Sequence, residues 1–566
     1  MPEGCNAVAL GTCSEAEGGN TLALGAFSHA EGNGTTAGGF TAHSEGASST
    51  AVSNVSHAEG NQTKATGTSS HAEGASTTAS GDSSHAEGIQ TNAQGTASHS
   101  QGLNTAAAGN VSHAEGNNTK AYGVGSHSEG INTFAGILGN ANSADHAEGY
   151  LTSAEGGFGS HSEGAVTSAR GVASHAEGIN NIAGATGSHS EGRVTLAGGI
   201  ASHAEGAGTK AGGENSHAEG DNTTAGGTAS HAEGYRTTAG STSSHAEGTE
   251  TTASGASSHS EGNNTSAVGT ASHAEGNNTR AIGLEAHAEG YFTTASGGLG
   301  SHAEGGAAEA RGDAAHAEGY LTIASGFASH AEGEQTGTNT FRNAHVMGRF
   351  GSANEANSWF IGNGTSNAAR GIGARWSAGT GNMSIDGPTY FTNGADYAEM
   401  FETADGNPIE PGYFVTVVQE GKISMAAAND AFILGVTSAA PSVCGDSAEL
   451  GWQGRYLTDE WGRRMYHEVV LPAVKDGEGN MLVPESVETQ PILNPEWDPS
   501  RQYVSRSKRP EWTAVGLIGK IRVRDDGTCE AGGYCRPGDN GTATRADGGY
   551  FVLKRTGPNQ ILVLFR

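Results

Sequence analysis

Two carboxylates lie three residues apart in the segment Asp396-Tyr-Ala-Glu399. A carboxylate at Asp396 can reach the carbonyl carbon of Ala395 through a six-membered ring, or it can hold a water molecule beside it. Glu399 can act as a base or as a proton donor to the leaving amide, since two carboxyl groups in different environments often divide these roles. On spacing alone, however, Asp-x-x-Glu is a common pattern that usually marks solvated surface.

A second candidate for chemistry is the repeated motif Ser-His-Ala-Glu-Gly. Its histidine occurs 22 times from His29 to His330, and 18 of the 21 intervals are 14 residues. Histidine and glutamate are good ligands for divalent metals, so stacked copies offer metal sites. The alternative is a hydrogen-bonded ladder that orders a subunit interface. We adopt this alternative, because Gln101 replaces one glutamate and no acidic calcium loop accompanies the motif. We therefore expect no metal and no cofactor.

The repeat also predicts the elements that position these residues. Its consensus is His-Ala-Glu-Gly-x-x-Thr-x-Ala-x-Gly-x-x-Ser, in which small residues alternate and turn formers lie between them. This pattern favours two short strands and two turns per repeat, and a glycine every few residues excludes a helix. We expect an all-β protein in which residues 1–333 form a parallel β-solenoid of 14-residue coils, stacked at about 4.8 Å.

The histidine and the glutamate of each motif lie two residues apart, so on a strand they point to one face. They stay constant while other outward positions vary, which indicates a constant environment such as a subunit interface. We predict such an interface ladder along the row that includes His57 and Glu59, and His217 and Glu219. The alanine interior buries few methylenes, so a single roll should be marginally stable and should associate.

Charge and composition exclude several classes of function. The chain has 566 residues and a net charge of −31, and residues 1–335 hold 34 acidic side chains against 8 basic ones. Such a surface repels polyphosphate, so we expect no nucleic acid partner. No apolar run approaches the roughly 20 residues that span a bilayer, and no signal peptide is recognisable, so we expect synthesis in the cytosol without membrane insertion.

The pattern changes after Gly333. Residues 334–395 keep short strands and glycine turns without a fixed period, which favours a fibre stem or linker. From Asp396 the chain alternates conventionally, as in 413–418 and 516–523, so residues 396–566 are expected to form a β-rich globular domain. The five cysteines indicate no disulfide framework, and Cys529 and Cys535 are either free thiols or a pair that bridges or binds metal.

The repeats resemble the trimeric head repeats of YadA-type bacterial adhesins. The segments 6–11 and 20–25 carry the closest match, and the resemblance extends to about residue 333. It implies a left-handed parallel β-roll, three parallel copies of the chain, and surface attachment. The polar histidine and glutamate of the repeated motif depart from the apolar adhesin pattern, and the signal and membrane anchor of an autotransporter are not expected here.

The C-terminal region resembles the peptidase G2 family, whose members are intramolecular chaperone domains of phage tail spikes, neck appendages and related fibres. The resemblance implies a trimeric domain that sets the register of the fibre before it and then cuts itself off, between Ala395 and Asp396, with Asp396 and Glu399 as the catalytic carboxylates. Some members have serine where this chain has Ala395, so a hydroxyl is not required there. The resemblance covers residues 391–566, and the segments that carry it are 394–399, 454–457, 509–512, 523–529 and 552–555.

We therefore expect a homotrimeric tail or neck fibre of a bacteriophage, displayed on the virion, which attaches to an unknown glycan or protein receptor on a cell surface. Its C-terminal domain would be a single-turnover, self-cleaving endopeptidase. The alternatives are a cellular or spore-surface adhesin with the same assembly domain, and a non-cleaving fibre with a C-terminal cap. A hydrolase acting on a host polymer is disfavoured, because the repeats show no Ser-His-Asp set, acidic cleft or metal cluster.

Overall fold

The computed structural model describes residues 6–566 apart from 138–142, 388, 452–453, 476–480 and 484. It divides into two compact units, residues 1–376 and 377–566. Among the described residues the only helices are two single turns, η1 (Gln419–Gly421) and η2 (Arg506–Lys508), and neither is long enough to span a membrane. The expected all-β class is confirmed.

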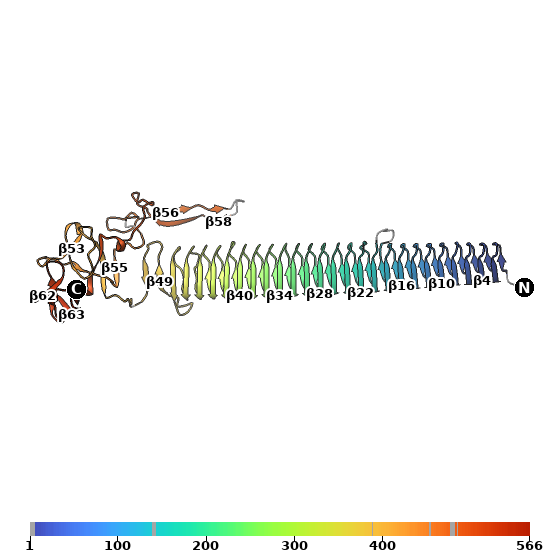
Figure 1. Ribbon diagram of the computed structural model, residues 1–566, viewed down its shortest axis with the longest axis horizontal. Coiled ribbons are helices and arrows are strands. Elements are labelled where there is room, and N and C mark those ends of the chain that lie inside the picture. The colour runs from blue at the N-terminus through green and yellow to red at the C-terminus, as the bar shows by residue number, and fades with distance from the viewer. Residues whose placement is uncertain (1–5, 138–142, 388, 452–453, 476–480, 484) are drawn as a thin grey trace. The chain divides into compact units, whose positions relative to one another are not determined.

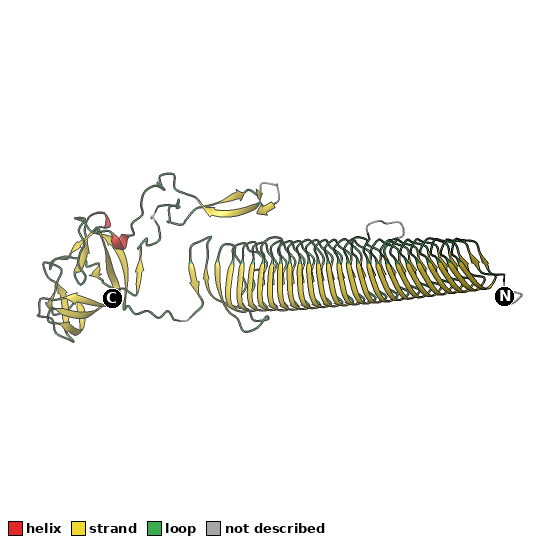
Figure 2. Ribbon diagram, turned by 45° about the vertical axis from the view of Figure 1, so that its right-hand side comes forward, coloured by secondary structure: helices red, strands yellow, loops and turns green. Residues whose placement is uncertain are grey.

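The first unit is a solenoid built from two rows of short parallel strands. The even-numbered strands from β2 (Glu15–Gly19) to β46 (His330–Glu334) have five residues, and from β4 (His29–Asn33) onward each begins at the histidine of the repeated motif. The odd-numbered strands from β1 (Val8–Ala9) to β45 (Ile323–Ala324) have two residues. Figures 1 and 2 show these rows as one continuous stack. The predicted β-solenoid of 14-residue coils is confirmed.

Successive coils pair in register, residue for residue. In β30 (His217–Asp221) each residue pairs with its counterpart one coil later, so that His217 lies beside His231 and Glu219 beside Glu233. The interior holds alanine, serine and threonine, and Ala218 is fully buried. Where the chain turns, the Ser216 hydroxyl donates to the Gly213 carbonyl at 2.6 Å. Each coil is thus held mainly by backbone hydrogen bonds to its neighbours.

The glycine of the repeated motif is required by this close stacking. Gly220 has a φ of +108°, and a Cβ atom added there would lie 2.1 Å from the carbonyl oxygen of Gly234 in the next coil. No side chain fits at that distance, and the φ itself is unfavourable for other residues. The constant glycine therefore marks the closest contact between coils.

The solenoid continues beyond the last copy of the motif. Strands β47 (His345–Arg349) and β48 (Trp359–Asn363) extend the same parallel row, and β49 (Ile372–Trp376) then pairs antiparallel with β48. Val346 and Phe360 are buried at the position that alanine fills in earlier coils. The spacing of 15 and then 14 residues from His330 to His345 and Trp359 was a signal that the sequence prediction of an irregular stem missed. The expected boundaries at 333 and 395 stay predictions.

The second unit has a main sheet whose strand order is β53-β52-β54-β60-β64-β63-β61-β62, with β51 paired to β60 and β55 paired to β51. The long strand β60 contacts β51, β54 and β64. Large residues such as Phe414, Val523 and Ile561 form its core. The strands are β50 (Met383–Ile385), β51 (Asp396–Glu402), β52 (Phe414–Val417), β53 (Ile423–Met425), β54 (Gly435–Thr437), β55 (Val443–Gly445), β56 (Tyr466–Leu471), β57 (Val474–Lys475), β58 (Met481–Val483), β59 (Ser486–Pro491), β60 (Trp512–Arg524), β61 (Tyr534–Pro537), β62 (Ala543–Ala546), β63 (Tyr550–Gly557) and β64 (Gln560–Phe565).

Replacing Gly220 by alanine should destabilise the solenoid. Its Cβ atom would meet a carbonyl oxygen at 2.1 Å at a positive φ, and such strain typically costs about 1–3 kcal/mol. Gly226→Ala is the matched control in the same coil, since its Cβ atom would lie 3.9 Å from the nearest atom. Denaturant unfolding followed by circular dichroism should show a lower midpoint for Gly220→Ala only. Equal midpoints for the two variants would contradict this account of the stacking.

Candidate functional site

The Ala395–Asp396 peptide bond is held from two sides at the start of β51. The Gly394 carbonyl accepts a hydrogen bond from the Ser442 hydroxyl at 3.0 Å. The Ala395 carbonyl accepts one from the backbone N–H of Lys520 at 3.2 Å, and the Asp396 carbonyl accepts one from the backbone N–H of Ser442 at 2.7 Å. Three successive carbonyls are therefore fixed between the segment before β55 and the strand β60.

Asp396 is buried directly beside this bond. The residue is 6% exposed, and its Oδ2 atom has no hydrogen-bond partner. It lies so close to Gly516 that a Cβ atom added there would be 2.7 Å from Oδ2. Burying a polar atom without a partner costs about 1–3 kcal/mol, and a catalytic role, stored strain or a bound water can account for such a group. A buried carboxylate therefore lies beside the candidate bond, and its catalytic role stays a prediction.

Glu399 lies on the other face of β51. Along this strand Asp396 and Ala398 are buried, whereas Tyr397 is exposed and Glu399 is partly exposed. The Tyr397 hydroxyl donates to Glu399 Oε1 at 2.5 Å, and this hydrogen bond raises the pKa of Tyr397. Residues three apart on a strand point to opposite faces, so one chain does not bring the two carboxylates together. The catalytic roles of both residues stay predictions.

Cys444 is a neighbour of the site that the sequence analysis did not single out. It pairs with Ala398 across β51 and β55. Burial raises the pKa of its thiol, and so do the nearby carboxylates, including those of Asp396 and Glu399. A thiol that keeps its proton is a poor nucleophile, so Cys444 does not compete with the carboxylates for the chemical role.

Cys529 and Cys535 are buried free thiols. Burial raises the pKa of Cys529 to about 11 and that of Cys535 to about 12. Both are packed in the core of the second unit. They contribute to packing, and the site at β51 does not include them.

A cleft of about 830 Å³ opens at the Ala395–Asp396 bond. Three of its lining residues are basic and alternate along β60, namely Lys520, Arg522 and Arg524, all of which are exposed. Alternate residues of a strand share a face, so they form a basic stripe in a chain whose net charge is −31. The alternation is visible in the sequence, but its position beside the bond depends on the pairing of β60 with β51.

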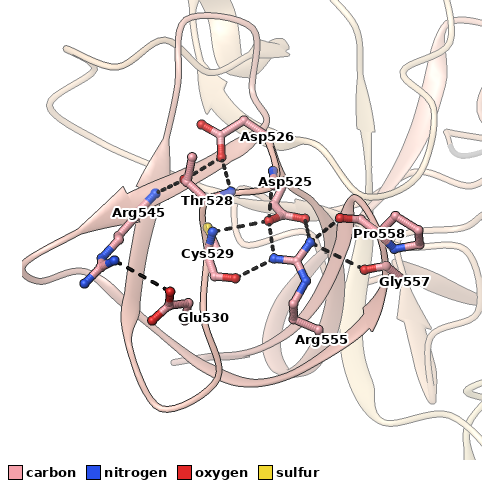
Figure 3. Close-up of polar contacts among 10 residues, drawn as sticks. Asp525, Asp526, Thr528, Cys529, Glu530, Arg545, Arg555, Gly557 and Pro558 are labelled. Carbon is pink, nitrogen blue, oxygen red and sulfur yellow. Dashed lines mark hydrogen bonds and ion pairs between the residues drawn. The ribbon is translucent and has the colours of Figure 1, made fainter.

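Two of the segments that carried the peptidase G2 resemblance meet in a buried ion pair (Figure 3). The Arg555 guanidinium donates to the two carboxylate oxygens of Asp525 at 2.9 and 3.1 Å, and the Asp525 side chain is fully buried. Arg555 also donates to the carbonyls of Cys529, Gly557 and Pro558. This bidentate contact fastens the loop after β60 to the β63–β64 hairpin. These motif residues therefore support the strand that holds the candidate bond.

The histidines of the solenoid form a stacked ladder. The rings of His203, His217 and His231 follow one another with centroids 4.9 Å apart. His217 Nε2 lies 3.9 Å from Glu219 Oε2, and in the coil of His57 and Glu59 the corresponding distance is 3.6 Å. These side chains are roughly one-third to one-half exposed in a single chain, and their Nε2 atoms lack hydrogen-bond partners. The Nε2 atoms themselves are buried within the chain, and the subunit interface along this row stays a prediction.

Stacking places many titratable groups close together. The pKa is lowered for ten of the histidines, first by burial and then by the charge of neighbouring histidines, while nearby glutamates raise it in part. For His330 the pKa is lowered to about 4. The other nine are His43, His71, His99, His113, His146, His175, His217, His245 and His302. In these ten histidines the close packing of the row therefore disfavours the protonated form.

The same row brings potential metal ligands together. In groups such as His57, Glu59 and His71, three ligand atoms lie within 4.8 Å of one another. A structural zinc ion usually takes four ligands, so one such group is incomplete by itself.

Comparison with known proteins agrees with the C-terminal resemblance. Residues 351–560 match the family model described as Peptidase_G2, IMC autoproteolytic cleavage domain. The pre-neck appendage protein of Bacillus phage B103 is 38% identical over 164 residues, which are 29% of this chain and 17% of that protein. The putative phage-related protein YobO of Bacillus subtilis (strain 168) is 37% identical over 163 residues, 28% of this chain and 19% of that protein. Each match therefore covers less than a fifth of the relative. The recognition of a peptidase G2 domain is confirmed.

Two solved structures are also similar. A C-terminal fragment of bacteriophage phi29 gene product 12 aligns with 34% identity over 30% of this chain and all of the fragment, with a TM-score of 0.25. The pre-mature form of the same gene product aligns with 16% identity over 98% of this chain and 71% of that chain, with a TM-score of 0.35. Both scores are too low to support a conclusion about the fold of this chain.

Replacing Arg555 by lysine should destabilise the C-terminal unit, because lysine cannot make the bidentate contact with Asp525. Removing one partner of a buried pair costs about 3–5 kcal/mol, and the lysine charge should reduce this to about 2. Arg545→Lys is the matched control, because its pair with Glu530 is 67% and 74% exposed, and exposed pairs contribute about 0–1 kcal/mol. Thermal unfolding of the full chain measures both. Equal losses would show that the Asp525 contact has no special role.

Acid should weaken the solenoid. In the ten histidines with a lowered pKa, such as His217, the folded pKa lies below the ordinary value of 6.5. As the pH drops below about 6.5, the unfolded chain therefore takes up protons before the folded chain does, and the stability of the solenoid falls. The loss is complete only below the folded pKa, which for His330 is about 4. Calorimetry of the full chain should show the solenoid transition moving to lower temperature between pH 7 and 5. The second unit has one histidine, His467, so its transition should move less. A solenoid transition temperature that stays constant between pH 7 and 5 would contradict the expected effect of histidine protonation.

Proposed function

We propose that this protein is an appendage of a phage neck or tail, in which a homotrimeric β-solenoid fibre is assembled by its C-terminal domain and then released from it by self-cleavage between Ala395 and Asp396. One observation carries the proposal. The bond lies fixed beside a buried Asp396 carboxylate whose Oδ2 has no partner, in a region that matches an autoproteolytic family. The likeness to phage pre-neck appendage proteins supports the location on a virion.

The reaction is hydrolysis of one peptide bond. Asp396 either attacks the Ala395 carbonyl carbon, which gives an anhydride that water then opens, or directs a water molecule to that carbon. In both routes the C–N bond breaks, one water is consumed, the Ala395 carbonyl becomes a carboxylate, and the Asp396 nitrogen takes up the two protons of that water and becomes an ammonium group. Because the chain is cut once, each copy turns over once.

Glu399 takes part in this reaction only after the chains have assembled. It lies on the opposite face of β51 from Asp396 and is bound by Tyr397, so it cannot serve the Asp396 of its own strand as arranged in one chain. In the trimer, Glu399 of one copy can face the cleavage site of another. This arrangement would make cleavage depend on correct assembly, so that unassembled chains keep their chaperone domain.

The same logic explains why a fibre would need such a domain. Its coils are nearly identical, so three chains can pair in many wrong registers. Pairing of distant segments also has an entropic cost that precedes the stabilising contacts. A compact domain with a core of its own, built around Phe414 and Val523, can hold three ends together while the fibre forms. Cleavage then traps the fibre kinetically, since refolding lacks its guide. The His/Glu ladder is the surface we assign to contact between copies.

We assign the mature fibre to attachment at a host or other cell surface, through a receptor of glycan or protein type. A second candidate is a fibre whose C-terminal unit is a cap that never cleaves. This candidate is favoured by one observation, the placement of Asp396 and Glu399 on opposite faces of β51.

Self-cleavage should leave two fragments, residues 1–395 and the remaining 171 residues (566 minus 395). Denaturing mass spectrometry of the purified protein should find both, and Asp396→Asn and Glu399→Gln should each leave an intact chain that still assembles. Glu402→Gln is the matched control, because this partly exposed glutamate of the same strand binds Lys422 instead. Its cleavage should be normal. Wild-type chains that remain whole after assembly would favour the cap.

A further inference from the structure

The carbonyl oxygen of Ala395 has a donor already aimed at it. The backbone N–H of Lys520 donates to this oxygen at 3.2 Å. Ser442 binds the carbonyls on either side, those of Gly394 and Asp396, so the Ala395 carbonyl is the one that faces β60. Under the proposed function this is the carbonyl whose carbon is attacked.

Gly519 is what allows β60 to come this close. A Cβ atom added at Gly519 would lie 2.4 Å from the Ala395 oxygen and 2.8 Å from the Cα atom of Asp396. The residue also has a φ of +122°, which side chains disfavour. Glycine is therefore needed here for contact with the reacting peptide as well as for backbone conformation.

The cleft beside this oxygen is lined by charged groups of both signs. Lys520 and Arg522 line the cleft into which the Ala395–Asp396 bond opens. Arg524 lines it too, and donates to the Pro411 carbonyl at 2.9 Å. Asp396 and Glu410 line the same cleft, and Glu410 Oε2 lies 3.9 Å from Arg524 Nη2, so the backbone donor is the group that contacts the oxygen directly. Attack on the Ala395 carbon puts a negative charge on its oxygen, whichever of Asp396 or water attacks.

We propose that the backbone N–H of Lys520 is an oxyanion donor for self-cleavage and that Gly519 is the positioning residue that admits it. This inference rests on the proposed function. As the carbonyl carbon becomes tetrahedral, its oxygen gains charge and the N–H contact strengthens toward the 2.7–3.1 Å that oxyanion donors show. When the C–N bond breaks, the electron pair on this oxygen re-forms the C=O double bond, and the leaving Asp396 nitrogen is protonated. The donor itself exchanges no atoms.

A purely structural role is the competing explanation, since this hydrogen bond also continues the pairing of β51 with β60. The two roles differ in what they change. A ladder bond contributes to stability, whereas an oxyanion donor contributes to the rate of cleavage in chains that are already folded and assembled. Removing one oxyanion donor typically lowers the rate about 100- to 1000-fold.

The direct test replaces Lys520 in the full chain by its α-hydroxy analogue, which turns the amide between residues 519 and 520 into an ester. This change removes the N–H and keeps the side chain. We expect cleavage of the assembled protein, followed as release of the 171-residue fragment, to slow about 100-fold or more. The same replacement at Arg522, an exposed residue that lines the same cleft, controls for an ester in β60.

A second pair of variants keeps the test independent of ester chemistry. Gly519→Ala should abolish or strongly slow cleavage, because its Cβ atom meets the Ala395 oxygen. Gly527→Ala is the matched control, since Gly527 also has a positive φ, +90°, but no atom within 4 Å of an added Cβ. Thermal unfolding and sedimentation of every variant separate effects on folding from effects on rate.

The outcomes separate the two proposals. If wild-type chains are cut and the Lys520 ester is cut within about threefold of the Arg522 ester, the oxyanion role is wrong and self-cleavage stands. If the slowing of each variant follows its loss of thermal stability, the hydrogen bond is structural only. If wild-type chains are not cut at all, the proposed function fails and this donor has no reaction to serve.

Discussion

The close in-register stacking of coils is the contact on which the rest of this protein depends. Each coil buries only small side chains, so its neighbours supply most of what holds it, through backbone hydrogen bonds and the tight approach at glycines such as Gly220. Such a fold is nearly one-dimensional: stability adds up along the stack, and one coil resembles the next. If several chains pair along such a stack, as proposed, their register is poorly specified, because a shift by one coil loses few contacts.

The C-terminal unit has the properties that the solenoid lacks. It has large core residues, non-local strand pairing and a buried ion pair between Asp525 and Arg555. Its central strand β60 pairs with three other strands and also supplies the N–H that binds the Ala395 carbonyl. The central strand of the sheet is therefore also the strand that contacts the proposed cleavage site. If this unit aligns several chains as proposed, the contacts that fold it also hold the Ala395–Asp396 bond.

Much of the fold could be predicted because the repeat makes its own pattern visible. The 14-residue period, the small interior and the constant glycine all follow from stacking. The coils at His345 and Trp359 were missed because the repeated motif ends before them and larger residues replace alanine there, although their spacing continues the period. The candidate site was harder to predict from the sequence. Spacing alone favoured solvated surface for Asp396 and Glu399, and the family resemblance assigned them chemistry. On a strand this spacing also separates the two side chains. The Lys520 N–H could not be predicted, because the position of a backbone donor depends on strand register and not on residue type.

If the C-terminal unit guides assembly and is then cut off, the chains must associate before they are cleaved. Native mass spectrometry of freshly synthesised chains, sampled over time, resolves single chains, assemblies of whole chains and assemblies of shortened chains. The account predicts that three whole chains associate first and that the 171-residue fragment is then lost from the assembly. Shortened single chains that appear before any assembly, or whole chains that never associate, would contradict it.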